Sequence, residues 1–231
     1  MSQLWLRVQA PFAAFRGFQA GVFRASAPVM PPSTAYGLVL NLAGIEMRDT
    51  FQYMTTLIRR DLPKIQIAIG LSSLPERSSI YQQLHSYPVG ASGKELKEKT
   101  HGAKYWITPV RREFLTDYDG IIGLQSEDEI LFEQIKRGLR GELEINRYGL
   151  PFLGDNNFLI DRLEIISEPC PKTIWYARML PDDAPRKGSC RLTVGIDRAD
   201  NSRTTSFLYA PWAVGQSLPP ETAWTWTPSA P

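Results

Sequence analysis

The sequence predicts an α+β fold whose first elements follow the order β-α-β-β-α-β. Three observations predict it: segments in which apolar residues alternate with polar ones, apolar helix-like segments between them, and short proline-punctuated strands after residue 168. This is the element order of the ferredoxin-like fold, whose sheet is commonly used to bind RNA. The chain has 231 residues, of which 43% are hydrophobic, so it can bury a core of its own.

Strands are expected where apolar residues occupy every second position. The alternation is clear at Leu4, Leu6 and Val8, and again in the isoleucines between residues 65 and 69. A later segment reads as two short strands around a turn. The expected strands lie at residues 4–12, 64–74, 103–125 (the pair around a turn) and 156–166, and in the C-terminal region at 173–180, 189–196 and 204–212.

Helices are expected over residues 33–46, 50–60 and 126–140. Pro31 and Pro32 lead into the first of them, and Ser33 is its expected N-cap. The acidic first turn of the last helix suits the positive end of a helix dipole. Gly37 lies inside the first helix, where glycine costs roughly 1 kcal/mol relative to alanine, so it needs a reason. Either another backbone or an RNA phosphate approaches the helix there, or the helix packs closely on the sheet.

Charge is distributed unevenly along the chain, although its net value is only +2. Residues 1–112 contain 14 Lys and Arg against 6 Asp and Glu, whereas residues 113–168 contain 5 against 13. The basic first part indicates a polyanionic partner, and the acidic part indicates a solvent-facing surface or a basic protein neighbour. Two solvated surfaces without a partner are the alternative.

Several classes of protein are excluded by what the sequence lacks. No window approaches the roughly 20 consecutive apolar residues of a transmembrane helix, so we expect a soluble intracellular protein with no membrane contact. Cys170 and Cys190 fit no zinc or C-x-x-C spacing, which indicates ordinary thiols in a reducing compartment. No phosphate loop and no nucleophile motif is complete, so we expect neither a metal nor a cofactor.

Two basic stretches indicate binding to nucleic acid. Residues 85–112 combine lysines and arginines with glycines and both histidines, as a hairpin or loop laid over a phosphate backbone requires; an exposed Lys/Glu loop is the alternative. Near the N-terminus, Arg16 and Arg24 lie among phenylalanines, some of which must belong to the core. Interleaved arginines and aromatic rings suit a single strand, because bases stack on the rings and phosphates pair with the arginines.

Two segments resemble a known family. The run from residue 4 to residue 46, with Ala10-Pro11-Phe12, an arginine-containing loop and Pro31-Pro32-Ser33-Thr34 before Gly37-Leu38, resembles the N-terminus of CRISPR-associated protein five (Cas5). Residues 147–161, which include Pro151-Phe152-Leu153-Gly154, are similar to the segment by which that family enters its last ferredoxin-like strand. The compact length resembles the type I-B and MYXAN branch of this family.

The resemblance implies a ferredoxin-like (RAMP or RRM-like) palm over residues 1–167, a thumb hairpin inserted at about residues 85–112, and a small β-rich region at residues 168–231. It implies a crRNA-binding subunit of a type I Cascade complex in the prokaryotic cytoplasm. That subunit caps the 5′ handle of the crRNA beside Cas7 and Cas8, so that the complex targets DNA under RNA guidance in antiviral defence. The RNA-binding residues that we expect are Arg16, Gln19, Phe23, Arg24, Ser33, Thr34, Gly37, Lys94, Lys97, Lys99, His101, Lys104, Arg111 and Arg112.

Two alternatives to a binding subunit stay open. In the type I-C branch, the family member cuts pre-crRNA without metal, using tyrosine, lysine and histidine, and such chemistry needs a base, an acid and a cation at the phosphate. The candidates here, which match no family pattern residue by residue, are Tyr36 or Tyr53, Lys99 or Lys104, and His101. The second alternative is a protein-only scaffold, in which Trp224 and Trp226, on one face of an extended segment, pack into a neighbour rather than onto their own domain.

Overall fold

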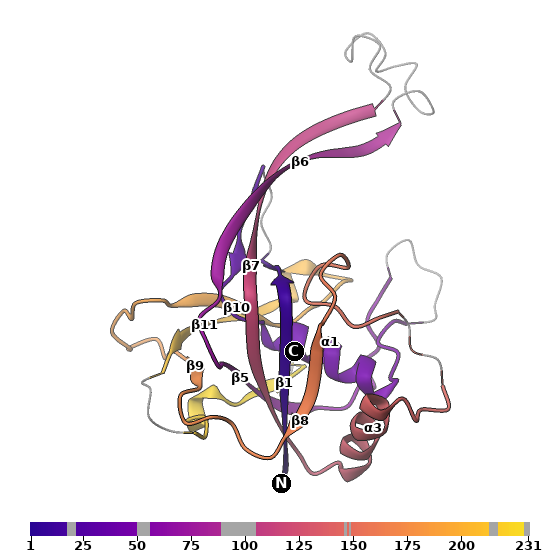
Figure 1. Ribbon diagram of the computed structural model, residues 1–231, viewed down its shortest axis with the longest axis vertical. Coiled ribbons are helices and arrows are strands. Elements are labelled where there is room, and N and C mark those ends of the chain that lie inside the picture. The colour runs from indigo at the N-terminus through magenta and orange to yellow at the C-terminus, as the bar shows by residue number, and fades with distance from the viewer. Residues whose placement is uncertain are drawn as a thin grey trace.

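A computed structural model describes residues 1–17, 22–49, 56–88, 105–145, 147, 149–212 and 217–228; the side chains of residues 84–88 and 105–108 are outside this description. In the described part, a ten-stranded sheet carries two α-helices on one face. A two-stranded hairpin projects from the sheet, and further strands extend one of its edges (Figure 1).

Four antiparallel strands form the centre of the sheet, in the spatial order β5-β7-β1-β8. Alternation builds them as expected, since Leu4, Leu6 and Val8 of β1 are buried together under the helices. The predicted strands at 4–12, 64–74 and 156–166 are confirmed, although the last is shorter. The observed bounds are β1 (Ser2–Ala13), β5 (Ile65–Leu71), β7 (Tyr105–Ser126) and β8 (Arg162–Ile166).

The prediction of two short strands around a turn within residues 103–125 is wrong, because β7 is one continuous strand of 22 residues. Asp117 has a φ of 54°, yet the strand continues through it. The reason is that both halves of β7 have a partner: Leu115 to Ser126 pair with β1, and Tyr105 to Thr116 pair with β6 (Glu76–Pro88). Tertiary pairing therefore overrides the local turn signal.

Helix α1 (Pro32–Ala43) and helix α3 (Glu129–Arg140) confirm two of the three predicted helices. Asp128 caps α3, accepting a hydrogen bond from the Leu131 N–H at 3.0 Å, and Glu129 supplies the acidic first turn. The helices pack on one another so closely that a Cβ atom placed on Gly138 would lie 1.8 Å from the Leu42 carbonyl oxygen. No helix in the described part of the chain has both the length and the apolarity to cross a membrane.

Two details of the helix predictions are wrong. Ser33 does not cap α1; the N-cap is Pro31, which has no side-chain donor or acceptor, and its carbonyl accepts from the N–H groups of Thr34 at 2.9 Å and Ala35 at 3.1 Å. The helix expected at 50–60 falls partly outside the described residues, and residues 56–60 are not helical. They pair back on residues 47–49 instead, which satisfies their backbone groups in an antiparallel bridge.

The C-terminal strands continue the same sheet. Both β9 and β12 pair with β5, and β11 and β10 follow β9 outward, so the C-terminal strands share a sheet with the N-terminal ones. Strands were predicted for three of these four segments. Their bounds are β9 (Ile174–Arg178), β10 (Cys190–Gly195), β11 (Thr205–Pro211) and β12 (Thr225–Thr227).

Tryptophans cover part of the sheet face opposite the helices. The ring of Trp5 lies 5.8 Å from those of both Trp175 and Trp224, measured between centroids. Trp224 therefore packs on its own chain, whereas Trp226, two residues later, is 45% exposed. Because this face is occupied by its own side chains here, it offers little room for a ligand.

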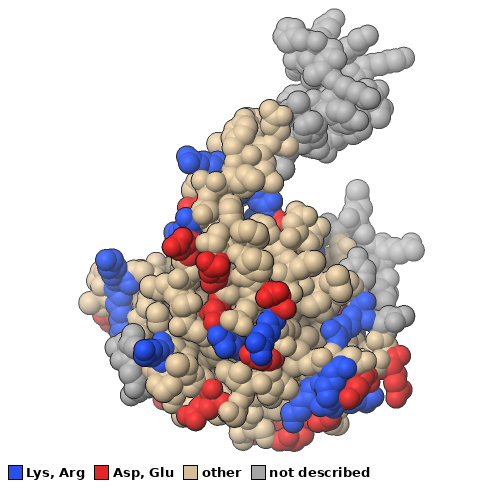
Figure 2. Space-filling model, viewed as in Figure 1, with Lys and Arg blue, Asp and Glu red and all other residues tan. Residues whose placement is uncertain are grey.

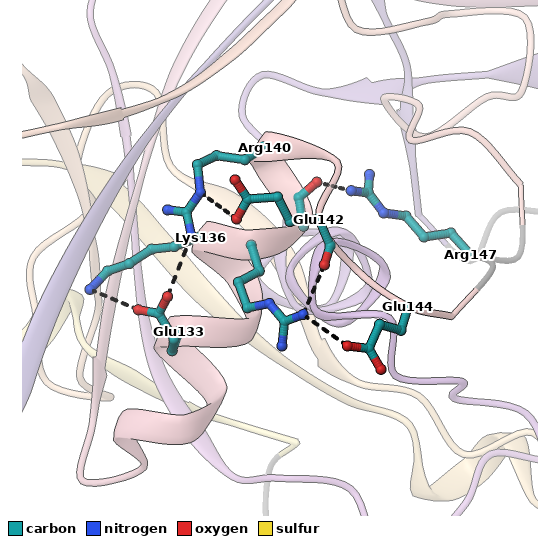
Figure 3. A network of polar contacts seen from close by, with 8 residues as sticks. Glu133, Lys136, Arg140, Glu142, Glu144 and Arg147 are labelled. Carbon is teal, nitrogen blue, oxygen red and sulfur yellow. Dashed lines mark hydrogen bonds and ion pairs between the residues drawn. The ribbon is translucent and has the colours of Figure 1, made fainter.

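Some acidic residues between residues 113 and 168 pair with arginines at the C-terminal end of α3. At the C-terminal end of α3, Arg140 lies 2.7 Å from Glu142 and 3.5 Å from Glu133, and Arg137 lies 3.7 Å from Glu144 (Figure 3). Blue and red atoms alternate over this region in the space-filling view (Figure 2). This end of α3 is therefore a network of exposed ion pairs, each of which contributes little to stability.

Candidate nucleic-acid interface

The base of the projecting hairpin brings together two stretches that are far apart in the sequence. Strand β3 (Phe23–Arg24) pairs in parallel with β7, which places Phe23 beside Arg111 and Arg24 beside Arg112. The Arg111 N–H donates to the Val22 carbonyl at 2.7 Å. The hairpin base is thus a three-stranded ribbon of β3, β7 and β6, which contains four of the predicted RNA-binding residues.

The two faces of this ribbon carry different side chains. Across the strands, Arg111 of β7 pairs with Phe23 on one side and with Tyr81 of β6 on the other. These three residues share one face, because directly paired residues point to the same side of a sheet. Phe23 is 49% and Tyr81 66% exposed. We call this row the Phe23–Arg111–Tyr81 row.

The opposite face holds an ion-pair cluster around Asp155. Arg112 contacts the Asp155 carboxylate, and Arg16 Nη2 lies 2.8 Å from Asp155 Oδ2. The side chains of Arg112 and Asp155 are 10% and 6% exposed, whereas that of Arg16 is 38% exposed. Burial opposes ionisation of Asp155, but the Asn157 N–H and the two arginines outweigh it and hold the pKa of this carboxyl below its ordinary value. Arg112 is therefore committed inside the protein, and Arg16 is only partly available.

Asp155 is held by a tight turn that docks on the strand after β1. Inside the turn, the Asn157 N–H donates to Asp155 Oδ1 at 3.0 Å, and the Phe158 N–H donates to the Asp155 carbonyl at 2.9 Å. The Leu153 carbonyl accepts from the Ala14 N–H at 3.0 Å. Gly154 has a φ of 77°, and a Cβ atom there would lie 2.0 Å from the Ala14 carbonyl oxygen. The segment Pro151-Phe152-Leu153-Gly154 thus places Asp155 under the hairpin base.

Replacing Gly154 by alanine should lower the free energy of unfolding by about 2 kcal/mol, because left-handed backbone strain adds to the clash with Ala14. Gly149 is a matched control: its φ is 73°, but no described atom lies within 4 Å of its Cβ position. Gly149→Ala should therefore cost only the strain, about 1 kcal/mol. Urea denaturation of both variants measures the difference; equal losses would contradict a constraint by Ala14.

Arg111 and Arg24 of the hairpin base differ from Arg112. Arg111 donates from Nε to Ser79 Oγ at 3.2 Å, and neither terminal nitrogen of its guanidinium has a partner in the described part of the chain. Arg24 is half-buried and makes no ion pair with any described residue. Both arginines therefore have donors that no described group satisfies.

The start of α1 lies apart from this ribbon. Ser33, Thr34 and Gly37 are half-buried on a helix that packs against α3 and the sheet. A Cβ atom on Gly37 would meet only Met47 Sδ, at 3.7 Å, which is an ordinary contact. Close packing of the helix therefore does not explain this glycine, and the approach of an RNA phosphate stays a prediction.

Tyr36, one tyrosine candidate for RNA cleavage, is buried, and its hydroxyl donates to the Pro63 carbonyl at 2.8 Å. Burial raises the pKa of Tyr36 above its ordinary value, so this hydroxyl is neither presented at the surface nor prepared to lose its proton. The other predicted residues lie outside the described part of the chain: Gln19, Tyr53, Lys94, Lys97, Lys99, His101 and Lys104.

The face of the central sheet opposite the helices is not a free basic surface. Its arginine in the middle of β1, Arg7, binds Asp119 through two contacts, of 3.0 Å and 2.7 Å, and Gln9 donates to the same carboxylate at 3.2 Å. Together with the tryptophans described above, these pairs occupy the face on which RNA binding was expected for this element order. The hairpin base is the better candidate.

Sequence reasoning missed Asp155 and Tyr81. Asp155 follows a recognisable turn segment, but nothing local shows that it meets Arg16, which is 139 residues away. Tyr81 is an exposed aromatic residue on a largely polar strand, and only the register of β6 against β7 places it beside Arg111.

Comparison with solved structures shows the class of fold. A chain described as "CRISPR RNA-guided surveillance complex" superposes with a TM-score of 0.60 and 15% sequence identity, covering 93% of this chain and 91% of that one. A second, described as "Crystal structure of Cas protein", has a TM-score of 0.48 and 16% identity over 93% of this chain and 96% of that one. A sequence comparison with curated proteins finds no match.

The sequence model of the family described as CRISPR-associated protein (Cas_Cas5) matches residues 3–141. This match covers more than half of the 231 residues. The chain belongs to the Cas5 family.

Proposed function

We propose that this chain is the crRNA-binding subunit of a type I Cascade complex, in which it caps the 5′ handle of the crRNA. Family membership supports the class of function, and the basic three-stranded hairpin base supports RNA as the ligand. In this proposal the four central strands with α1 and α3 form the ferredoxin-like palm, and the β6–β7 hairpin is the thumb. The partners are Cas7, Cas8 and, through the complex, target DNA in the prokaryotic cytoplasm, as in the type I-B branch.

One observation carries the proposal: the pairing of β3 with β7 brings Arg24 and Arg111 to the same hairpin base, on opposite faces of the ribbon, and both arginines have donors that no described group satisfies. Unpaired guanidinium groups beside exposed aromatic rings suit a phosphate backbone with unstacked bases.

The test is the salt dependence of binding to crRNA-handle RNA. For a single strand, the logarithm of affinity falls with the logarithm of salt by about 0.7 per phosphate neutralised, so Arg24→Ala with Arg111→Ala should reduce the slope by roughly 1.4. The melting temperature should hardly change, because neither arginine makes an ion pair with a described residue.

The double variant Arg140→Ala with Arg203→Ala, which removes two exposed arginines elsewhere, is the control and should leave the slope unchanged. An unchanged slope in the Arg24/Arg111 variant, together with a lowered melting temperature, would show that these arginines are structural and would contradict the proposal.

A further inference from the structure

In the Phe23–Arg111–Tyr81 row, one exposed aromatic ring lies on each side of the Arg111 guanidinium group. The flanking residues on this face are polar: Ser79 lies next to Tyr81 along β6, and Glu113 lies next to Arg111 along β7. Exposed aromatic side chains are not needed for the core, which is formed elsewhere. The two rings of this row therefore belong to neither hydrophobic core cluster of the described residues.

The spacing of the strands limits what the two rings can hold. Neighbouring strands lie about 4.8 Å apart, so the backbones at Phe23 and Tyr81 are separated by about 10 Å across β7. Two rings that sandwich one flat base must lie roughly 7 Å apart, twice the contact distance between carbon atoms. Each ring is consequently placed to take a base of its own.

The charged groups on this face favour binding of a phosphate between the two rings. The Arg111 Nε is held by Ser79 Oγ, which fixes the guanidinium against β6 while its terminal nitrogens have no described partner. The one acid of this part of the face, Glu113, accepts a hydrogen bond from the Ser26 N–H at 3.1 Å. Its carboxylate is thereby turned toward the β2–β4 ribbon (Phe15–Arg16 with Ser26–Ala27).

We propose that Phe23 and Tyr81 each stack on one of two consecutive unpaired bases of an RNA strand, while Arg111 binds the phosphate that joins them. This inference rests on the proposed function and assigns to Tyr81 a role in it. Stacking on a ring tolerates every base, so this part of the interface binds single strands without reading their sequence. Paired bases of a duplex are unavailable to the rings, so duplex RNA should bind more weakly.

The test uses the full chain and a short oligouridine, with the matching duplex as a second probe. Tyr81→Ala should weaken binding of the single strand by roughly 5- to 150-fold, the range measured for removal of one stacking residue. Tyr81→Phe keeps the ring and should bind within about twofold of wild type. Ile80→Ala is the matched control, because Ile80 is the neighbouring exposed residue on the other face and is 46% exposed.

Salt dependence separates stacking from charge. Tyr81→Ala should leave the slope of affinity against salt unchanged, whereas Arg111→Ala should reduce it by about 0.7. If wild type binds the RNA and Tyr81→Ala binds equally well, the stacking proposal is wrong although the proposed function stands. If wild type binds no RNA, both are wrong. If Tyr81→Ala binds RNA normally but no longer joins its partner subunits, the row is a protein contact and the proposal is overturned.

Discussion

Replacing Asp155 by alanine should lower the free energy of unfolding by about 3–5 kcal/mol, the cost of removing one partner from a buried ion pair. The variant leaves the Arg112 guanidinium, whose side chain is 10% exposed, without its carboxylate. It also removes the acceptor that holds the turn through the Asn157 N–H. Urea or thermal denaturation of the purified chain measures the loss.

The control is Asp61→Ala, because Asp61 also pairs with an arginine but is 68% exposed in that pair. Its loss should cost no more than about 1 kcal/mol. A similar small loss for Asp155→Ala would show that the cluster is not a buried ion pair in solution.

The same carboxylate should make stability depend on pH in the acid range. The folded-state pKa of Asp155 lies below its ordinary value, so its contribution is fully present above about pH 4 and is lost as the pH falls through the lower folded value. The Asp155→Asn variant has no carboxylate at this position and therefore lacks this pH-dependent contribution to the free energy of unfolding. The difference in unfolding free energy between wild type and Asp155→Asn should therefore narrow below about pH 4.

Two glycines in helices should respond in opposite directions to the same substitution. Gly138→Ala should destabilise the protein by about 3 kcal/mol, because the new methyl group would lie 1.8 Å from the Leu42 carbonyl oxygen and force α3 away from α1. Gly37→Ala should stabilise it by up to about 1 kcal/mol, since alanine favours the helix and meets only Met47 Sδ at 3.7 Å.

Denaturation of both variants under one set of conditions checks the contrast. The α-helical propensity gain is the same at the two positions, so the difference between them isolates the contact of the helices. If Gly138→Ala were neutral, the close approach at Leu42 would be incorrect. RNA binding by Gly37→Ala is measured beside its stability, because an unchanged affinity would contradict phosphate approach at this residue.

Elements that depend on local pattern were predictable from the sequence. Alternation at Leu4, Leu6 and Val8 gave β1, and the acidic residues after residue 126 gave the start of α3. The continuity of β7 was not predictable in this way, because the turn expected within residues 103–125 rests on local pattern, while the pairing that overrides it comes from β1 and β6. The cap expected at Ser33 failed because Pro31 begins the helix two residues earlier.

The candidate site was predictable in its composition and not in its geometry. Four arginines lie in basic stretches of the sequence, and no local pattern distinguishes them: Arg16, Arg24, Arg111 and Arg112. The fold separates them, since a parallel pairing of β3 with β7 sets the residues that face one another, and the turn at Asp155 takes up Arg112. Which arginine stays available is thus decided by contacts between segments, which no local pattern records.

Because β7 is continuous, the strand register of the central sheet also fixes the strand register of the projecting hairpin. Its residues Leu115 and Thr116 pair with β1 and with β6 at once, so the two ladders cannot slide independently. A single residue inserted into β7 between Arg112 and Leu115 would exchange the two faces of the part of β7 on the hairpin side of the insertion, since strand side chains alternate with a period of two. Arg111 would then turn toward the Asp155 side and Arg112 outward. An insertion into β7 between the Phe23–Arg111–Tyr81 row and the central sheet must therefore add two residues, not one, if Arg111 is to stay on the outward face.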